Sequence, residues 1–242
     1  MRVQTAVMPA LRLLRALAAR VETVTLLAFL AIAGGLWAFI GLSEEMLEGD
    51  LHAFDRTVLL ALRDPADPAT PIGGHSAAIA LRDLTALGGF TVLTLVTGLV
   101  FAFLLIRRQR ASALFLLAAV LGGQALSNLA KLGFDRPRPD LVPHGVEVVS
   151  ASFPSGHTLM ATVTWLTLAV MLARGEESHR LRAFYIAAAA LISVLVGVSR
   201  VYLGVHWPSD VLAGWSLGSA WALLVWLVAR WLERRGGIER EA

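Results

Sequence analysis

Long apolar stretches separated by short charged segments dominate the sequence. About 20 consecutive apolar residues cross the hydrocarbon core of a bilayer as an α-helix. On this basis we predict membrane spans at residues 21–42, 85–106, 111–130, 158–173, 183–199 and 209–230. The chain is therefore expected to be an all-α integral membrane protein, with residues 1–242 forming one membrane-embedded bundle of six transmembrane helices.

Two segments outside the spans also carry a helical pattern. Residues 1–20 combine arginines with leucines at helical spacing, which is typical of a short basic helix on an anionic membrane surface or of a frayed tail. Residues 43–83 are predominantly acidic, and within them apolar residues recur with helical period from Leu51 to Leu62. We predict a helix resting on the membrane surface there, ended by the D-P-A-D-P turn at 64–68.

Composition agrees with a membrane protein and excludes several other classes. Hydrophobic residues make up 57% of the chain and charged residues only 16%, which is too apolar for an ordinary soluble domain. The cations are clustered beside apolar runs, so no nucleic-acid partner is predicted. The chain has no cysteine, which excludes disulfides, thiolate metal sites and cysteine nucleophiles.

The distribution of positive charge predicts the topology. Cytoplasmic loops of membrane proteins are enriched in Lys and Arg. With both termini cytoplasmic, 14 of the 21 Lys and Arg residues fall on the cytoplasmic side. The predicted topology is thus a multi-pass protein of the plasma (inner) membrane whose loops at 131–139, 150–157 and 199–210 all emerge on the periplasmic or extracellular face.

Those three loops contain the candidate chemistry. In the second, P-S-G-H at 154–157 directly precedes an apolar helix, whose unpaired N–H groups and dipole favour an anion. Gly156 has no Cβ to block an approaching anion. The outer loops also hold two histidines and four cations: His157, His206, Lys131, Arg136, Arg138 and Arg200. Arginine and lysine beside a helix N-terminus are typical of a phosphate site.

His206 and Asp210 lie four residues apart across a predicted helix start. At this spacing the carboxylate can bind one ring nitrogen and leave the other free to attack, as in other oriented nucleophiles. No carboxylate cluster occurs among the three loops, so neither a metal ion nor another cofactor is expected.

These residues resemble the type 2 phosphatidic acid phosphatases, a family of membrane lipid phosphatases that share their site with vanadium haloperoxidases. The family pattern is Lys, six residues, Arg-Pro; then Pro-Ser-Gly-His; then Ser-Arg, five residues, His, three residues, Asp. The sequence matches it without departure at Lys131 with Arg138-Pro139, at 154–157, and at Ser199-Arg200 with His206 and Asp210.

The resemblance implies a role for each matched residue. His206 would attack phosphorus to form a phosphohistidine, and Asp210 would stabilise its imidazolium. His157 would protonate the leaving oxygen and later accept a proton from water. The phosphoryl oxygens would be held by Lys131, Arg138, Ser155, Gly156 and Arg200. Arg136 lies outside the family pattern, and we interpret it as a contact for a second phosphate group.

The expected substrate is a membrane lipid phosphate or diphosphate, of the undecaprenyl diphosphate, phosphatidate or phosphatidylglycerophosphate type, and no protein partner is predicted. Because Arg136 lies beside Arg138, we expect a preference for the prenyl diphosphate with relaxed specificity. A lipid phosphotransferase on the same fold is the first alternative, which the sequence does not separate from a phosphatase. An anion transporter is less favoured because its charges would lie near the midplane. Gly214 and Gly218, a G-x-x-x-G in the last span, are interpreted as packing inside the bundle.

Overall fold

The computed structural model describes residues 23–146 and 150–234. The basic helix predicted at 1–20 lies outside these residues. The described part of the chain is helical apart from its connecting loops, and its only β-contact is a single bridge between Arg63 and Pro71. Its helices are α2 Thr23–Glu48, α3 His52–Leu60, α4 Gly74–Ala86, α5 Phe90–Ile106, α6 Arg110–Gly133, α7 Gly156–Arg174, α8 His179–Tyr202 and α9 Pro208–Arg234.

Five helices are long and apolar enough to cross a membrane, namely α2, α6, α7, α8 and α9. The pair α4 and α5 gives a sixth span if it is counted as one, with a bend of 43° at the break between the two helices. The prediction of an all-helical membrane protein is therefore confirmed. The location of the termini stays a prediction.

The predicted regular span at 85–106 is wrong in detail, because the chain breaks at Gly88 and Gly89 before α5 begins. A Cβ on Gly88 would lie 2.8 Å from the backbone oxygen of His157 and 2.6 Å from a methyl group of Val196. Only glycine fits at this distance, so the break allows the α4–α5 corner to touch the first turn of α7.

Three residues of the predicted loops are helical in the structure. Arg200 and Ser199 lie in the last turns of α8, which continues to Tyr202, and Lys131 lies in the last turn of α6. Apolar residues on both sides of Arg200 continue the buried face of α8, and this extends the helix past its charged residue. All three side chains are therefore held on helix ends and not on free loops.

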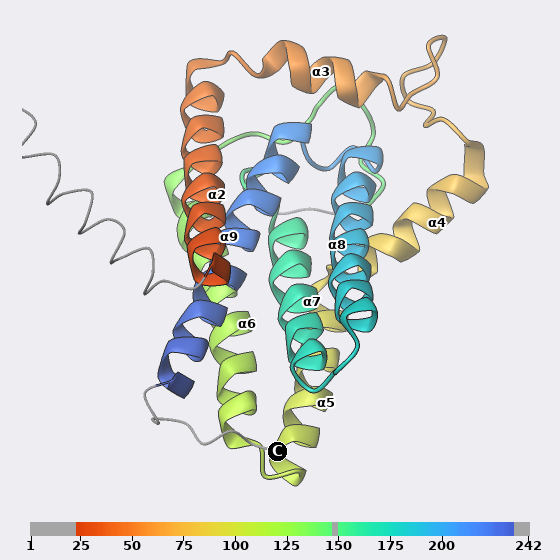
Figure 1. Cartoon of the computed structure of the whole chain (residues 1–242). Helices are drawn as coiled ribbons and strands as arrows, with labels where there is room; N and C mark the ends of the chain where they lie inside the picture. The colour runs from red at the N-terminus through yellow and green to blue at the C-terminus, as the bar shows by residue number, and fades with distance from the viewer. Residues whose placement is uncertain (1–22, 147–149, 235–242) are drawn as a thin grey trace, which may run out of the picture.

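The surface helix predicted from the pattern at 51–62 is present as α3. It lies across one end of the bundle, above the upright helices (Figure 1). Two of its own side chains, Asp55 and Leu59, are buried against the bundle, while Phe54 is exposed. The helix thus covers the end of the bundle at which α6 ends and α7 begins.

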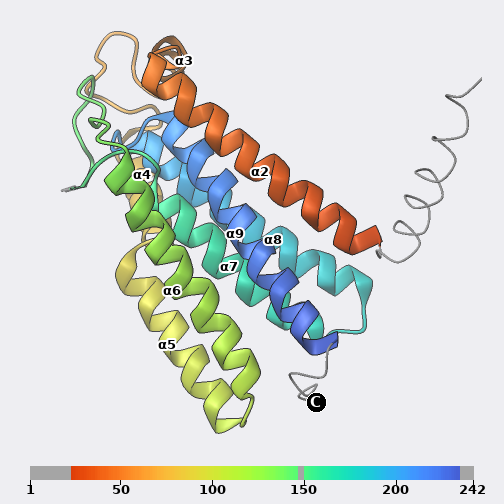
Figure 2. The same cartoon turned by 90° about the vertical axis from the view of Figure 1, so that its left-hand side faces the viewer.

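Helix α7 occupies the centre of the bundle and packs against α5, α6, α8 and α9. Helix α2 packs along the outside of α9 (Figure 2). Gly214 and Gly218 face α7, where an added Cβ would lie 2.9 Å from the backbone oxygens of Ser155 and Leu159 respectively. The interpretation of this pair as packing within the bundle is confirmed, and the close contact fixes α9 against the first turn of α7.

Candidate active site

The candidate site lies at the end of the bundle where α6 and α8 end and α7 and α9 begin. Antiparallel packing of these four helices brings together residues that are up to 79 positions apart, from Lys131 to Asp210. His157 has Arg200, His206, Lys131 and Arg138 as its electrostatic neighbours. The structure therefore gathers the cations and both histidines of the three sequence motifs at one place.

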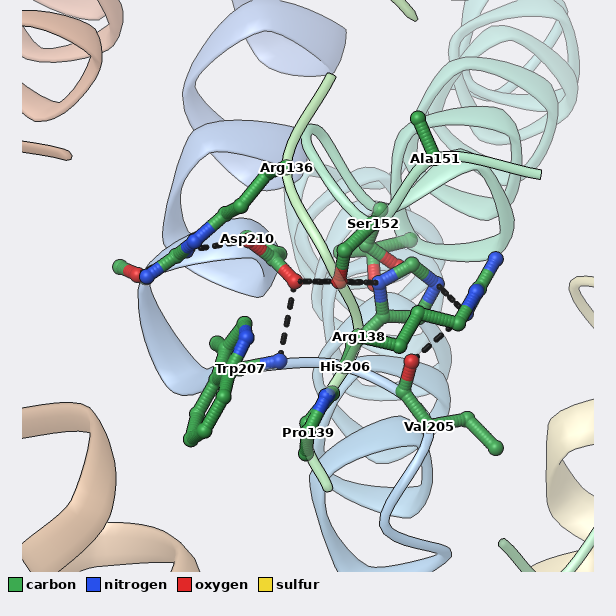
Figure 3. A network of polar contacts seen from close by, with 12 residues as sticks. Arg136, Arg138, Pro139, Ala151, Ser152, Val205, His206, Trp207 and Asp210 are labelled. Carbon is green, nitrogen blue, oxygen red and sulfur yellow. Dashed lines mark hydrogen bonds and ion pairs between the residues drawn. The ribbon is translucent and has the colours of Figure 1, made fainter. Parts of the chain in front are cut away.

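His206 and Asp210 form the pair that their spacing predicts. Helix α9 begins at Pro208, so His206 precedes the helix and Asp210 lies in its first turn. His206 Nδ1 is 3.3 Å from Asp210 Oδ2, and both side chains are buried (Figure 3). The carboxylate also lies at the positive end of the helix dipole, which stabilises its charge.

The contact with Arg138 indicates which tautomer of the His206 ring is present. One guanidinium nitrogen, Nη1, lies 3.3 Å from His206 Nε2. Because a guanidinium group only donates hydrogen bonds, Nε2 must carry the lone pair in this contact. The ring proton is then on Nδ1 and faces Asp210. The lone pair of His206 Nε2 is thus directed toward a guanidinium group, a cation that binds phosphate oxygens well.

Burial keeps His206 neutral at physiological pH. Desolvation lowers the pKa of the imidazole to about 4, although the hydrogen bond and the charge of Asp210 act to raise it. Arg200 and Arg138 lower the pKa further. A neutral ring retains its lone pair, which nucleophilic attack requires.

Asp210 has more partners than the sequence indicates. The backbone N–H of Trp207 donates to Oδ2 at 2.9 Å, and the hydroxyl of Ser152 donates to the same oxygen. Ser152 Oγ also lies 3.4 Å from His206 Nδ1. Ser152 belongs to no family motif, and only its position two residues before Pro154 could have suggested it.

Arg136 does not contact a second phosphate group, and the interpretation drawn from sequence is wrong. Its Nη1 donates to Asp210 Oδ1 at 2.5 Å and to Ser209 Oγ at 2.8 Å, and its Nη2 donates to Asp55 Oδ2 at 2.6 Å. The side chain is buried and lies over the ring of Trp207. Both terminal nitrogens are occupied by protein groups, so Arg136 positions Asp210.

Asp55 completes this network from α3. Besides Arg136, it accepts the backbone N–H of Ser209 at 2.9 Å and the hydroxyl of Ser209 at 2.7 Å. Asp55 therefore satisfies an unpaired N–H at the start of α9 as well as a buried cation. Sequence reasoning missed it because Asp55 lies 154 positions from Ser209.

Three cations near His157 have no carboxylate partner of their own in the described part of the chain. Lys131 Nζ donates to Ser150 Oγ and to the backbone oxygen of Ala151, each at 3.0 Å. Arg138 Nε donates to the backbone oxygen of Ser150 at 2.8 Å. Arg200 Nη1 donates to Thr85 at 3.1 Å. This excess of positive charge favours an anion.

The pKa of Arg138 is lowered by burial and raised by Asp210, and the guanidinium group stays charged. The Nε of Arg200 is buried without a hydrogen-bond partner among the described residues. A buried donor without a partner costs free energy, and a phosphate oxygen would satisfy it.

The first turn of α7 supplies further donors. Helix α7 begins at Gly156, as the sequence predicts, and Ser155 at its N-cap makes no side-chain cap hydrogen bond. The N–H of Ser155 donates to the backbone oxygen of Asp210 at 3.0 Å. A Cβ on Gly156 would lie 3.5 Å from Lys131 Cε, so this face of the glycine is turned toward Lys131.

The sequence matches a known protein family and several characterised relatives. The model of the PAP2 superfamily matches residues 112–234. The chain is 35% identical over 141 residues to phosphatidylglycerophosphatase B of Bacillus subtilis, covering 57% of this chain and 68% of the relative. It is 35% identical over 108 residues to undecaprenyl-diphosphatase of Sulfolobus acidocaldarius, covering 43% of this chain and 47% of that relative.

A solved structure matches most of the chain. The crystal structure of a transmembrane PAP2 type phosphatidylglycerolphosphate phosphatase from Bacillus subtilis superposes with a TM-score of 0.69 at 26% sequence identity. The superposition covers 88% of this chain and 98% of that protein. The likeness therefore extends beyond the site to the arrangement of the helices.

Proposed function

The chain belongs to the PAP2 superfamily and is a lipid phosphatase, and we propose that it releases phosphate from a membrane lipid phosphate or diphosphate through a phosphohistidine on His206. The observation that carries this proposal is the placement of the His206 ring. Its Nδ1 faces Asp210 and its Nε2 faces Arg138, so the attacking nitrogen lies where a phosphoryl group would be bound.

The reaction proceeds in two displacement steps. In the first, the Nε2 lone pair attacks phosphorus, the bond from phosphorus to the leaving oxygen breaks, and His157 gives that oxygen a proton. The positive charge on the imidazole is balanced by Asp210. In the second, His157 takes a proton from water, the water oxygen attacks phosphorus, the P–N bond breaks, and phosphate leaves.

The three cations stabilise the charge that develops on the phosphoryl oxygens in both steps. Lys131, Arg138 and Arg200 surround the nucleophile from α6, the following loop and α8. Ser155 and Gly156 supply the N-terminal turn of α7. Preorganised donors of this kind account for most of the rate enhancement in phosphoryl transfer, where the protein mainly positions and stabilises.

The charge distribution of the sequence supports an active site on the periplasmic or extracellular side of the plasma (inner) membrane. Because the chain lacks cysteine, this topology has a direct test. His144 lies at the site end of the bundle and Glu176 lies at the opposite end, between α7 and α8. A membrane-impermeant thiol reagent should label His144→Cys in intact cells and should leave Glu176→Cys unlabelled until the cells are lysed. The reverse pattern would place the active site in the cytoplasm.

The substrate is best supported at the level of a lipid phosphate. The curated relatives are named for phosphatidylglycerophosphate-type and undecaprenyl diphosphate substrates. The preference for a diphosphate that Arg136 suggested has no support in the structure, because Arg136 is occupied by Asp55 and Asp210. The site residues bind the phosphoryl group alone, so we propose relaxed specificity among lipids.

Phosphate release from purified protein tests this proposal. We expect kcat/KM values for phosphatidylglycerophosphate, phosphatidate and undecaprenyl diphosphate that lie within about tenfold of one another, or about 1.4 kcal/mol in transition-state energy. A soluble sugar phosphate should react at least about a hundredfold more slowly, since it lacks the tail that holds a lipid at the site. Efficient hydrolysis of the sugar phosphate alone would refute a lipid phosphatase.

Vanadate and chelators test the chemistry of the site. Cations and backbone donors surround His206, and the charge stabilisation that a metal ion supplies in other phosphatases is here assigned to Lys131, Arg138 and Arg200. We expect chelators to leave kcat unchanged and vanadate to inhibit competitively, because vanadate adopts a trigonal-bipyramidal geometry on the histidine nitrogen. Inactivation by a chelator with recovery on adding magnesium would contradict this mechanism.

A further inference from the structure

A cavity of about 1630 Å³ lies at the end of the bundle opposite to His206. It is lined by the last turns of α5, α7 and α9 and by the first turns of α6 and α8. Small-molecule pockets are typically about 300–1,000 Å³. The volume is therefore suited to a ligand with long chains.

The lining combines apolar walls with a basic rim. Apolar side chains from the five helices form the walls, among them Phe103, Leu168, Ile192 and Val225. The charged residues of the lining are Arg108, Arg110, Arg174, Arg230, Arg234 and Glu233. Five cations against one carboxylate leave a strong positive excess where the apolar walls end.

The cations differ in how they are held. Arg174 is paired with Glu233 at 2.6 Å and lies over the ring of Phe115, and Arg230 lies over the ring of Trp226. Arg108 and Arg110 lie in the tight turn between α5 and α6, and both are exposed. Arg108 adopts a left-handed backbone conformation with φ of 61°, which a residue with a side chain rarely does. This turn places Arg108 and Arg110 at the mouth of the cavity. Neither has a carboxylate partner among the described residues.

We propose that this cavity binds an anionic phospholipid of the leaflet opposite to the active site. The acyl chains would lie along the apolar walls, and the headgroup phosphate would be held between Arg108 and Arg110. Charge complementarity selects the occupant, because a zwitterionic lipid has no net charge to match the rim. Arginine forks also bind phosphate oxygens in bidentate geometry.

Location supports a lipid over a soluble anion. The turn at 107–110 and the segment at 174–182 place three further arginines, Arg107, Arg180 and Arg182, on this end of the bundle, as is typical of the side that faces anionic headgroups. The site is also separate from the phosphatase reaction. Its occupant is retained as a ligand and is not hydrolysed, so the inference does not depend on the proposed mechanism.

Thermal unfolding of the full chain in detergent, with added phosphatidylglycerol or phosphatidylcholine, tests the proposal. Phosphatidylglycerol is a suitable probe because it is a phosphodiester without the terminal phosphate that the active site removes. A ligand that binds only the folded protein raises Tm in a concentration-dependent way. We expect phosphatidylglycerol to stabilise the protein more than phosphatidylcholine does, both in the unaltered chain and in Arg138→Gln, which removes a cation of the active site.

Two double variants localise the effect. Arg108→Gln with Arg110→Gln removes the two cations of the cavity mouth, and we expect it to weaken the apparent affinity for phosphatidylglycerol at least about tenfold. Arg107→Gln with Arg180→Gln removes the same charge from exposed positions of the same end that do not line the cavity. This control should retain the affinity within about twofold.

Three results would overturn the proposal. The first is equal stabilisation of the unaltered chain by the two lipids, which needs no variant. The second is an equal loss of affinity in both double variants, which would indicate general attraction to the basic surface. The third is loss of the phosphatidylglycerol effect in Arg138→Gln, which removes a cation of the active site and would therefore place the lipid there. If the first double variant does not fold, Ala188→Phe, which narrows the apolar wall without changing charge, should also weaken the binding.

Discussion

Replacing His206 with alanine is expected to lower kcat by at least about 10⁴-fold, because it removes the atom that we propose forms the covalent bond to phosphorus. The surrounding cations remain, so binding of the lipid phosphate should change much less than kcat. Loss of a nucleophile removes an interaction that exists only in the reaction, and not one that binds the ground state. The measurement is phosphate release under single-turnover conditions with purified protein.

Trapping of the phosphoenzyme separates nucleophilic attack from a supporting role. Rapid quenching with labelled substrate should recover an acid-labile phosphohistidine from the unaltered protein and none from His206→Ala. Asp210→Asn keeps the shape of the side chain and the nucleophile, so it should form the same intermediate more slowly. His75→Ala changes an exposed histidine away from the site and should leave kcat unchanged. Turnover by His206→Ala above about a few per cent of the unaltered rate would contradict the assignment of His206 as the nucleophile.

The helices and the catalytic motifs follow from local sequence signals. Hydrophobic length predicts α2, α6, α7, α8 and α9, and helical spacing predicts α3. Pro208 with Ser209 and Asp210 marks the start of α9, which in turn predicts the pairing of Asp210 with His206. Each of these depends on residues that lie close together in the chain.

What the sequence does not reveal depends on contacts between distant segments. The break at Gly88 is needed because His157, 69 positions later, packs against it. Arg138 and Arg136 are two positions apart in one loop and carry the same charge, yet one faces the nucleophile and the other faces Asp55 and Asp210. Charge and spacing alone cannot tell such residues apart, because burial and the partners from α3 decide their roles.

Loss of Arg136 is expected to damage both the fold and the reaction. Arg136→Gln would leave two buried carboxylates, Asp55 and Asp210, facing each other without the cation between them. Breaking a buried ion pair in this way typically costs about 3–5 kcal/mol in the free energy of unfolding. Thermal unfolding in detergent should therefore show a clearly lower Tm, and Arg136→Lys should lie in between because one ammonium group cannot bridge both carboxylates as two guanidinium nitrogens do.

The kinetic signature of Arg136→Gln distinguishes positioning from general destabilisation. Arg136 holds Oδ1 of Asp210, whose Oδ2 orients His206, so its loss should slow phosphohistidine formation by about 10- to 100-fold, the usual effect of a residue that orients a functional group. KM should stay nearly constant, because Lys131, Arg138 and Arg200 still bind the phosphate. Arg138→Gln, which removes a cation that faces the nucleophile, should instead change KM and kcat together.

A second substitution at Asp55 tests whether the three residues act as one network. Removing the Asp55 carboxylate in the Arg136→Gln background eliminates one of the two unpaired charges, so Asp55→Asn with Arg136→Gln should be more stable than Arg136→Gln alone. Asp55→Asn by itself should be milder than Arg136→Gln, since Arg136 and Asp210 still balance each other. Asp50→Asn, at an exposed position of the same segment, should change neither Tm nor kcat. Strictly additive losses at Asp55 and Arg136 would show that the two side chains act independently, and α3 would then cover the site without helping to orient its nucleophile.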